Sequence, residues 1–245
     1  MEFILQINQT KKKKKVIKNQ CCLLIGNSRW HWAIQNEEKW SFLHTAPEPR
    51  RLKSLRSSIS KWAAVGPIPS EIKLDPSRCV KIQHIPLKNL PKWIGIDRAL
   101  VAWAAFEKAK AKNLHHKGLV IADAGTILSL TCVSSTGEFT GGQLVAGLKL
   151  QRSIMSTGAE QLKPVKRTNI PHDKFPITTE EAMLRGSFQA LIGIIIEAQK
   201  DTKMAIWLCG GDSRILFENL KDQINDLHHY SDLVLDAMIK IKLNT

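Results

Sequence analysis

Short apolar runs and alternating apolar and polar residues characterise the first half of the chain. Such runs are typical of strands, and they occur at residues 21–25, 29–35, 39–44 and 79–85. Apolar residues at helical spacing predict a helix over residues 54–66. A run rich in helix formers predicts a second helix over 97–113, where Asp97 is placed to cap the start. The first half is therefore expected to be an α/β unit that begins with a β-meander.

The second half repeats this order of patterns. Strands are predicted at residues 118–122, 126–133, 139–145 and 204–209. Helices are predicted at 148–158, at 178–200, shortly after residue 212 and at 231–242. In each half a loop of small residues separates the first strand from the strand that returns. This repetition predicts two related halves, residues 20–116 and 117–245.

The composition fits a folded protein that needs no disulfides. The chain has 245 residues, 43% of them apolar, which is enough to bury a sizeable core. No apolar run reaches 18 residues, and the apolar patch at residues 3–7 is too short for a signal peptide, so we expect a soluble, cytoplasmic protein without a membrane partner. The five cysteines are odd in number and form no C-x-x-C pair, which indicates reduced thiols.

The net charge of +14 is concentrated at one end of the chain. Residues 1–19 contain six lysines and one acid, and this segment is expected to be a disordered basic arm, with an upstream start codon as one explanation. Elsewhere basic residues are mixed with acids, and aromatic residues do not interleave with them. We therefore expect no specific nucleic-acid binding, although the arm keeps a nucleic-acid binder open as an alternative.

Three breaks after predicted strands carry candidate chemistry. They read IGNS at residues 25–28, DAGT at 123–126 and CGGD at 209–212. Small residues at such breaks let backbone N–H groups approach phosphate closely. The set resembles the two phosphate loops and the adenosine loop of the superfamily that contains acetate and sugar kinases, actin and heat-shock chaperones.

Further motifs narrow the resemblance to type III pantothenate kinases. The motifs of that family run in the order D-x-G-N-T, G-x-D-R, D-A-G-T, G-G-x-x-x-P-G, N-T-x-x-A and G-G-D. Their counterparts here are residues 24–28, 95–98, 123–126, 141–147, 178–182 and 210–212. Each motif is common by itself, but six in this order are specific.

The resemblance implies a fold, a reaction and a site. The fold would be two duplicated actin-like, ribonuclease H-like domains with an ATP cleft between them, in a homodimer. The reaction would be ATP-dependent phosphorylation of pantothenate to 4'-phosphopantothenate, the first step of coenzyme A synthesis, with Mg²⁺ and K⁺ or NH₄⁺. The implied substrate-binding residues are Gly95, Ile96, Asp97, Arg98 and Thr179, with Asp97 as the general base. The implied ATP-binding residues are Gly26, Asn27, Ser28, Arg29, Gly125, Thr126, Gly210 and Gly211, and Asp123 would bind the monovalent cation.

The residue types suit these roles. A carboxylate such as Asp97 can orient and deprotonate a hydroxyl, and the guanidinium of Arg98 can bind a carboxylate with two hydrogen bonds. Structural readings of the same residues stay open: Asp97 as a helix cap, DAGT as a tight turn and Thr179 as part of a helix cap. The eight histidines lack metal-ligand spacing and are interpreted as surface or core residues.

The sequence departs from the family at several positions. Leu24 stands where the family carries an aspartate, and leucine cannot ligate a hard cation. Ala146 replaces a proline, Thr178 replaces an asparagine, and the lone tyrosine, Tyr230, does not precede GIDR. These departures leave open the alternative that the protein is a catalytically impaired homologue with a ligand-binding or regulatory role.

Overall fold

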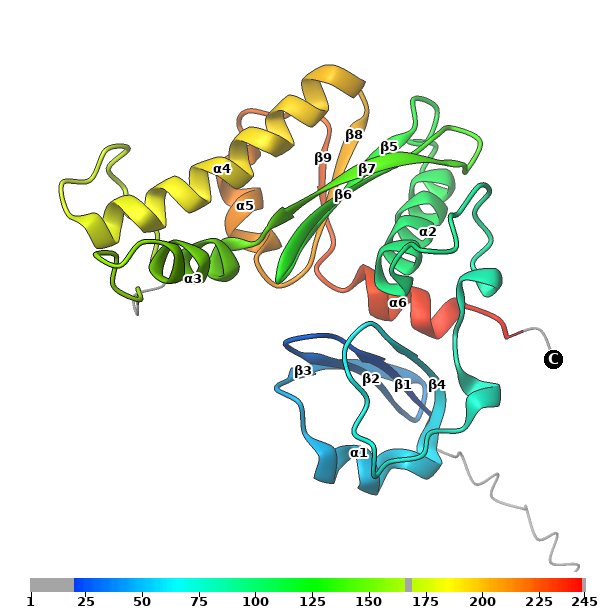
Figure 1. The fold of residues 1–245 in the computed structure, drawn as a ribbon. Coiled ribbons are helices and arrows are strands. Elements are labelled where there is room, and N and C mark those ends of the chain that lie inside the picture. Colours follow the sequence, from blue (N-terminus) through cyan, green and yellow to red (C-terminus); the bar gives the residue numbers. More distant parts are fainter. Residues whose placement is uncertain (1–19, 166–168, 244–245) are drawn as a thin grey trace, which may run out of the picture.

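The computed structural model describes residues 20–165 and 169–243, so the predicted basic arm at 1–19 lies outside the described residues. The described strands form two sheets (Figure 1). The first has the order β3-β2-β1-β4, from β1 (Cys21–Ile25), β2 (Trp30–Asn36), β3 (Lys39–Thr45) and β4 (Ile59–Ala64). The second has the order β7-β6-β5-β8-β9, from β5 (Leu119–Ala124), β6 (Ile127–Val133), β7 (Phe139–Ala146), β8 (Ala205–Cys209) and β9 (Leu227–His229).

In both halves α-helical sequence lies between the third and fourth strands, and an α-helix ends the half. The α-helices of the described chain are α1 (Pro49–Leu55), α2 (Ile96–Ala111), α3 (Leu148–Gly158), α4 (Thr179–Thr202), α5 (Ser213–Leu220) and α6 (Leu233–Lys240). Three short 3₁₀ turns, η1 (Arg56–Ser58), η2 (Pro76–Arg78) and η3 (Ile82–His84), belong to the first half.

The predicted duplication is confirmed by strand pairing. In each half the first strand pairs antiparallel with the second, the second pairs antiparallel with the third, and the first pairs parallel with the fourth. The predicted fold class, α/β with two actin-like units, is therefore correct. The second sheet carries a fifth strand, β9, parallel to β8.

Two local predictions in the first half are wrong. The helix expected over 54–66 is instead the end of α1, the turn η1 and the strand β4. Parallel pairing of β4 with β1, together with burial of Ile59 and Ala63 in cores on opposite faces of the sheet, outweighs the helical spacing. The strand expected over 79–85 is reduced to one parallel bridge between Trp62 and Cys79.

That bridge occupies the place that β9 has in the second sheet. The Val80 N–H donates to the Trp62 carbonyl at 2.8 Å, and the chain then turns into η3. The turn is held by the Lys81 N–H, which donates to His84 Nδ1 at 3.0 Å. The fifth strand of the first repeat therefore ends after one bridge.

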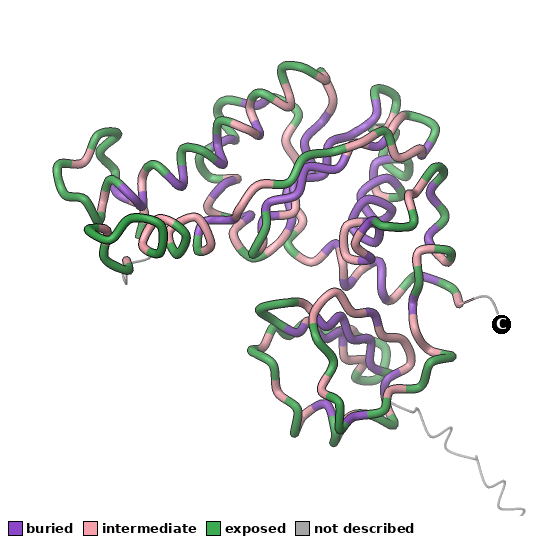
Figure 2. The backbone as a smooth tube through the Cα atoms, viewed as in Figure 1, coloured by how far each residue is buried: buried purple, intermediate pink, exposed green. Residues whose placement is uncertain are grey.

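Each repeat contributes its last helix to the sheet of the other repeat. Helix α2 packs against β5 and β6, whereas α6 packs against β1 and β2, and the two helices contact each other between the sheets (Figure 1). Their buried side chains join both sheets in one apolar core, and Figure 2 shows buried residues along both helices. Helices α4 and α5 cover the opposite face of the second sheet (Figure 1). The division between residues 116 and 117 stays a prediction for the boundary between the repeats.

Two expectations from composition can be compared with the fold. The five cysteines, all within the described residues, are free thiols in this structure. Across residues 20–165 and 169–243, no helix has the length and apolar character needed to cross a membrane.

Candidate active site

The two predicted phosphate loops meet although they lie far apart in the sequence. Ser28 Oγ in the first loop and Thr126 Oγ1 in the second are joined by a hydrogen bond of 2.8 Å. Both residues are exposed. Their two hydroxyl groups therefore lie together at the surface where the repeats face each other.

Close backbone packing holds each loop against the next strand end. Gly66, which follows β4, lies so near the Gly26 carbonyl that a side chain on Gly66 would collide with it. Gly210, which follows β8, has φ +89° and is packed in the same way against Asp123 and the Ala124 carbonyl. The Gly147 N–H donates to the Thr126 carbonyl at 2.9 Å. Gly66 and the motif glycines Gly147 and Gly210 thus serve the same purpose, which is to let backbones approach closely.

The third predicted loop joins the same site. The Asp212 N–H donates to the Ala124 carbonyl at 3.0 Å, which ties this loop to the second phosphate loop. A methyl group in place of a Gly211 hydrogen would lie 3.4 Å from Arg29 Nη1, so the Arg29 guanidinium reaches across from the first loop. Burial raises the pKa of Asp212, and the positive charges of Arg29 and Arg152 oppose that rise.

The first turn of α2 completes the cluster. Gly95 is the N-cap residue, so the structure corrects the expectation that Asp97 caps the helix; Asp97 lies in its first turn. Ile96 is buried, and the Arg98 N–H donates to Asp97 Oδ1 at 2.8 Å. A methyl group on Gly95 would lie 3.9 Å from Val65, which places this turn beside the end of β4.

Arg98 extends from α2 toward the second sheet. Its Nε and Nη2 each lie 3.3 Å from Thr131 Oγ1, and Thr131 is fully buried. Gly142 leaves room for this approach, since a methyl group there would lie 2.9 Å from Arg98 Nη2. Thr131 and Gly142 are site residues that the sequence did not reveal as contacts of Arg98.

Burial affects both candidate carboxylates, Asp97 and Asp123. Burial raises the pKa of Asp97, and hydrogen bonds from backbone N–H groups partly offset that rise. Burial, with a smaller contribution from the negative charge of Asp97, raises the pKa of Asp123 to about 7, while a hydrogen bond with the Cys209 side chain lowers it. The site therefore holds two carboxyl groups in a poorly solvated environment, which is a common property of functional sites.

Thr179 is the one predicted site residue that is not brought to this cluster. It is exposed at the beginning of α4, next to the cap residue Thr178, whose Oγ1 accepts a hydrogen bond from the Glu181 N–H at 3.3 Å. Figure 1 shows this end of α4 and the neighbouring α3 projecting away from the second sheet. Within one chain Thr179 is therefore remote from Asp97.

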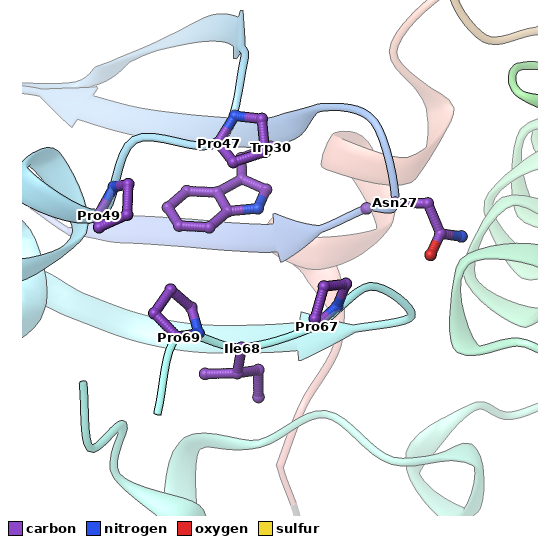
Figure 3. A pocket seen from close by; sticks show the side chains of 8 residues that line it. Asn27, Trp30, Pro47, Pro49, Pro67, Ile68 and Pro69 are labelled. Atoms are coloured by element: carbon purple, nitrogen blue, oxygen red, sulfur yellow. The ribbon is translucent and has the colours of Figure 1, made fainter. Parts of the chain in front are cut away.

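An apolar pocket of about 210 Å³ lies behind the first phosphate loop. Figure 3 shows the Trp30 ring among four prolines and Ile68, with Asn27 at one end. The lining residues are Gly26, Asn27, Trp30, Pro47, Pro49, Pro67, Ile68 and Pro69. Because Trp30 belongs to the core on the opposite face of the sheet from Leu24, this pocket is separate from the cluster around Asp97.

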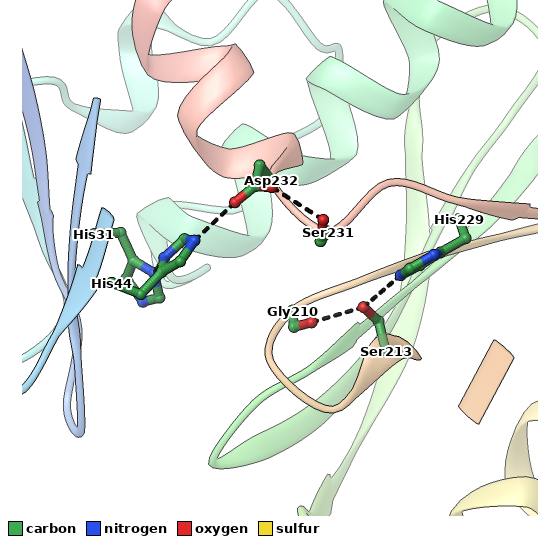
Figure 4. A network of polar contacts seen from close by, with 7 residues as sticks. All are labelled: His31, His44, Gly210, Ser213, His229, Ser231 and Asp232. Atoms are coloured by element: carbon green, nitrogen blue, oxygen red, sulfur yellow. Dashed lines mark hydrogen bonds and ion pairs between the residues drawn. The ribbon is translucent and has the colours of Figure 1, made fainter. Parts of the chain in front are cut away.

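Two histidines near the first loop were not predicted as site residues. His31 and His44 are hydrogen-bonded to each other, and His44 is hydrogen-bonded to Asp232, the N-cap residue of α6 (Figure 4). The interpretation of the histidines as surface or core residues is compatible with this pair, since His44 is exposed and His31 is half-buried. What the sequence did not reveal is the hydrogen-bonded contact between them and with Asp232. No local spacing could have revealed it, because its members come from three separate elements.

The residues present fit a nucleotide and its cations. Backbone N–H groups at the glycine loops, two hydroxyls and the Arg29 guanidinium are suited to phosphate oxygens. Within residues 20–165 and 169–243, no three His, Cys, Asp or Glu side chains are grouped to hold a metal ion by themselves. The oxygen-bearing side chains at the loops, Asn27, Ser28 and Asp123, are of the type that Mg²⁺ prefers, and Mg²⁺ usually keeps several waters and shares the phosphates of its nucleotide.

Comparison with known proteins identifies the family. The sequence profile described as "Type III pantothenate kinase" matches residues 49–201, more than half of the chain and beginning after the first phosphate loop. The type III pantothenate kinase of Thermosynechococcus vestitus is 27% identical over 208 residues, 81% of this chain and 80% of that protein. The Synechococcus elongatus type III pantothenate kinase is 25% identical over 223 residues, 82% of this chain and 87% of that protein.

Solved structures share the fold. A conserved putative Baf family transcriptional activator from Campylobacter jejuni superimposes with a TM-score of 0.59 at 18% identity, covering 90% of this chain and 96% of that one. The activator of 2-hydroxyisocaproyl-CoA dehydratase from Clostridium difficile, solved with bound ADPNP, superimposes with a TM-score of 0.51 at 12% identity, covering 92% and 93%. With the ordered motifs, the duplicated sheets and the profile match in agreement, the chain belongs to the type III pantothenate kinase family.

Proposed function

We propose that this protein transfers the γ-phosphoryl group of ATP to the 4'-hydroxyl of pantothenate, giving 4'-phosphopantothenate and ADP. The observation that carries the proposal is the meeting of both phosphate loops through Ser28 and Thr126. The family membership and the nearby first turn of α2 support the same reaction.

Each group in the cluster has a chemical task in this proposal. Glycine-loop N–H groups, Ser28, Thr126 and Arg29 hold the phosphates, while Gly210 and Gly211 allow the nucleoside to approach closely. Asp97 takes the proton of the acceptor hydroxyl. As this happens, the hydroxyl oxygen forms a bond to the γ-phosphorus, and the bond between that phosphorus and the oxygen of the leaving ADP breaks. The raised pKa of Asp97 suits a base that must both accept and release a proton. Arg98, fixed on Thr131, binds the pantothenate carboxylate.

Cations belong to the proposed site as bound partners. Mg²⁺ neutralises charge on the phosphate oxygens, and the oxygen-bearing side chains of Asn27, Ser28 and Asp123 are of the type it prefers. Asp123 is proposed to bind K⁺ or NH₄⁺, since an ionised carboxylate is a hard oxygen ligand.

The reaction can be tested directly with the purified protein. Incubation with ATP, Mg²⁺, K⁺ and pantothenate should give ADP and phosphopantothenate in equal amounts, measured by coupled ADP release and mass spectrometry. Omitting pantothenate should stop ADP release. Binding of ATP and pantothenate by calorimetry without any product would support the alternative of a ligand-binding homologue. Affinity for duplex DNA that falls steeply with salt would support the nucleic-acid alternative.

We also propose a homodimer that completes the substrate site. Thr179 lies on a projecting part of the chain whose apolar side chains are exposed: Leu144 is 62% exposed, Ile154 54%, Phe175 92% and Ile177 101%. Large apolar side chains this exposed are typical of an interaction surface when they lie on one face. A twofold contact through this surface would allow Thr179 of one chain to approach the cluster around Asp97 of the other.

Substituting Asp for Leu144 or Ile154 should convert the dimer to a monomer and raise the KM for pantothenate, because a charge would be buried at the interface. Light scattering after size-exclusion chromatography measures the first effect. Leu43→Asp is the matched control, since Leu43 lies on the corresponding edge strand of the first sheet. A dimer that persists in both test variants would contradict this interface.

A further inference from the structure

Two histidines and an aspartate form a hydrogen-bonded chain that the proposed reaction does not use. His31 Nδ1 on β2 and His44 Nδ1 on β3 are 2.7 Å apart, and His44 Nε2 lies 2.8 Å from Asp232 Oδ1 (Figure 4). The Ser231 hydroxyl donates to the other oxygen of Asp232 at 3.0 Å. His31 and His44 are also register partners in the sheet. Elements of both repeats therefore fix the His31 ring.

The carboxylate sets the direction of these hydrogen bonds. Ionised Asp232 only accepts, so His44 Nε2 carries a proton, and His44 Nδ1 is an acceptor when the ring is uncharged. His31 Nδ1 must then donate, which leaves His31 Nε2 with a free lone pair. Burial, with the neighbouring His44 and Arg29, lowers the pKa of His31 to about 4, so this ring is uncharged at neutral pH.

The lone pair lies beside the first phosphate loop. A methyl group in place of a Gly26 hydrogen would be 3.6 Å from His31 Nε2. His31 is the cross-strand partner of Leu24, so the two side chains are neighbours on one face of the sheet. Leu24 is 3% exposed and packs in the core between the sheets. The chain thus has an acceptor next to the position where the family motif has a carboxylate.

We propose that His31, oriented by His44 and Asp232, replaces the missing carboxylate and accepts a hydrogen bond through Nε2 from water bound to the divalent cation of the nucleotide. A phosphate oxygen without a proton cannot donate to a lone pair, whereas Mg²⁺ keeps several bound waters that can. The inference rests on the proposed nucleotide site. His44 and Asp232 are positioning residues, because they act through His31.

Nuclear magnetic resonance of the unmodified sequence tests the donor order. In protein labelled with ¹⁵N-histidine, His31 Nε2 should be unprotonated, and its resonance should shift on addition of Mg·ADP but not of ADP with EDTA. Calorimetry on the same samples reports nucleotide binding. A protonated Nε2, or an unmoved resonance while Mg·ADP binds, overturns this inference alone. Absence of any Mg·ADP binding overturns both the inference and the proposed function.

Variants test the role in affinity. His31→Phe should raise the Kd for Mg·ADP by about 10–100-fold, as loss of groups around a metal's ligands typically does, while the Kd for ADP in EDTA stays unchanged. His228→Phe is the matched control, because His228 also pairs with an aspartate but lies on β9. Adding Leu24→Asp to His31→Phe should restore the lost affinity. Circular dichroism checks that His31→Phe is folded. If the folded variant shows the same difference between its Kd for Mg·ADP and its Kd for ADP in EDTA as the wild type, the proposal is overturned. If the variant does not fold, the resonance experiment on the unmodified sequence decides.

Discussion

Replacing Asp97 with asparagine should lower the turnover number for pantothenate phosphorylation by about 10²–10⁴-fold, the usual contribution of a general base. An amide cannot accept the hydroxyl proton, but its oxygen can still accept the hydrogen bond that the Arg98 N–H now donates to Asp97. The Kd for Mg·ADP should therefore change little. Initial rates at saturating substrates and calorimetry measure the two effects separately.

The stability of this variant distinguishes loss of the base from loss of the fold. Burial raises the pKa of Asp97 above its unfolded value, so the folded state binds the proton more tightly and the group stabilises the fold below its unfolded pKa. That contribution is lost as the pH rises through the folded pKa. At neutral pH the variant should thus melt at or above the wild-type temperature. Asp201→Asn, an exposed change on α4, is the control, and wild-type turnover in Asp97→Asn would exclude Asp97 as the base.

Replacing Gly210 with alanine should destabilise the protein and disrupt nucleotide binding together. An alanine at φ +89° costs about 1–3 kcal/mol in backbone strain. Its methyl group would also collide with Asp123 Oδ1 and lie 2.7 Å from the Ala124 carbonyl, and such overpacking costs about 1–3 kcal/mol more. Urea unfolding measures the free energy of unfolding, and calorimetry measures the loss of Mg·ADP affinity.

Gly141→Ala separates the two causes. Gly141 also has a positive φ, +129°, but a methyl group there would meet no atom within 4 Å. This control should lose only the free energy due to backbone strain and should keep its nucleotide affinity. Equal losses in both variants would show that the packing of Gly210 against the second phosphate loop is unimportant.

Helices and strands whose signals lie entirely within their own residues were predictable from the sequence. The meander strands and the helices that became α2, α3 and α4 follow from periodicity and from helix start signals such as Thr178. The prediction for residues 79–85 failed because the chain turns into η3 after one bridge to Trp62. The prediction for β4 failed because this segment depends on a parallel neighbour, β1, from another part of the chain. A local pattern carries no information about such a partner.

The candidate site shows the same distinction between what local sequence patterns determine and what long-range contacts determine. The sequence by itself determined the residue types, their order in six motifs and hence the family, because short glycine loops and carboxylates carry their chemistry locally. Only the tertiary structure decided which groups meet. The Ser28–Thr126 bond spans 98 residues, and the His44–Asp232 bond spans 188. Sheet pairing and the exchange of α2 and α6 between the repeats create these contacts, since both depend on burial of apolar faces by elements remote in sequence.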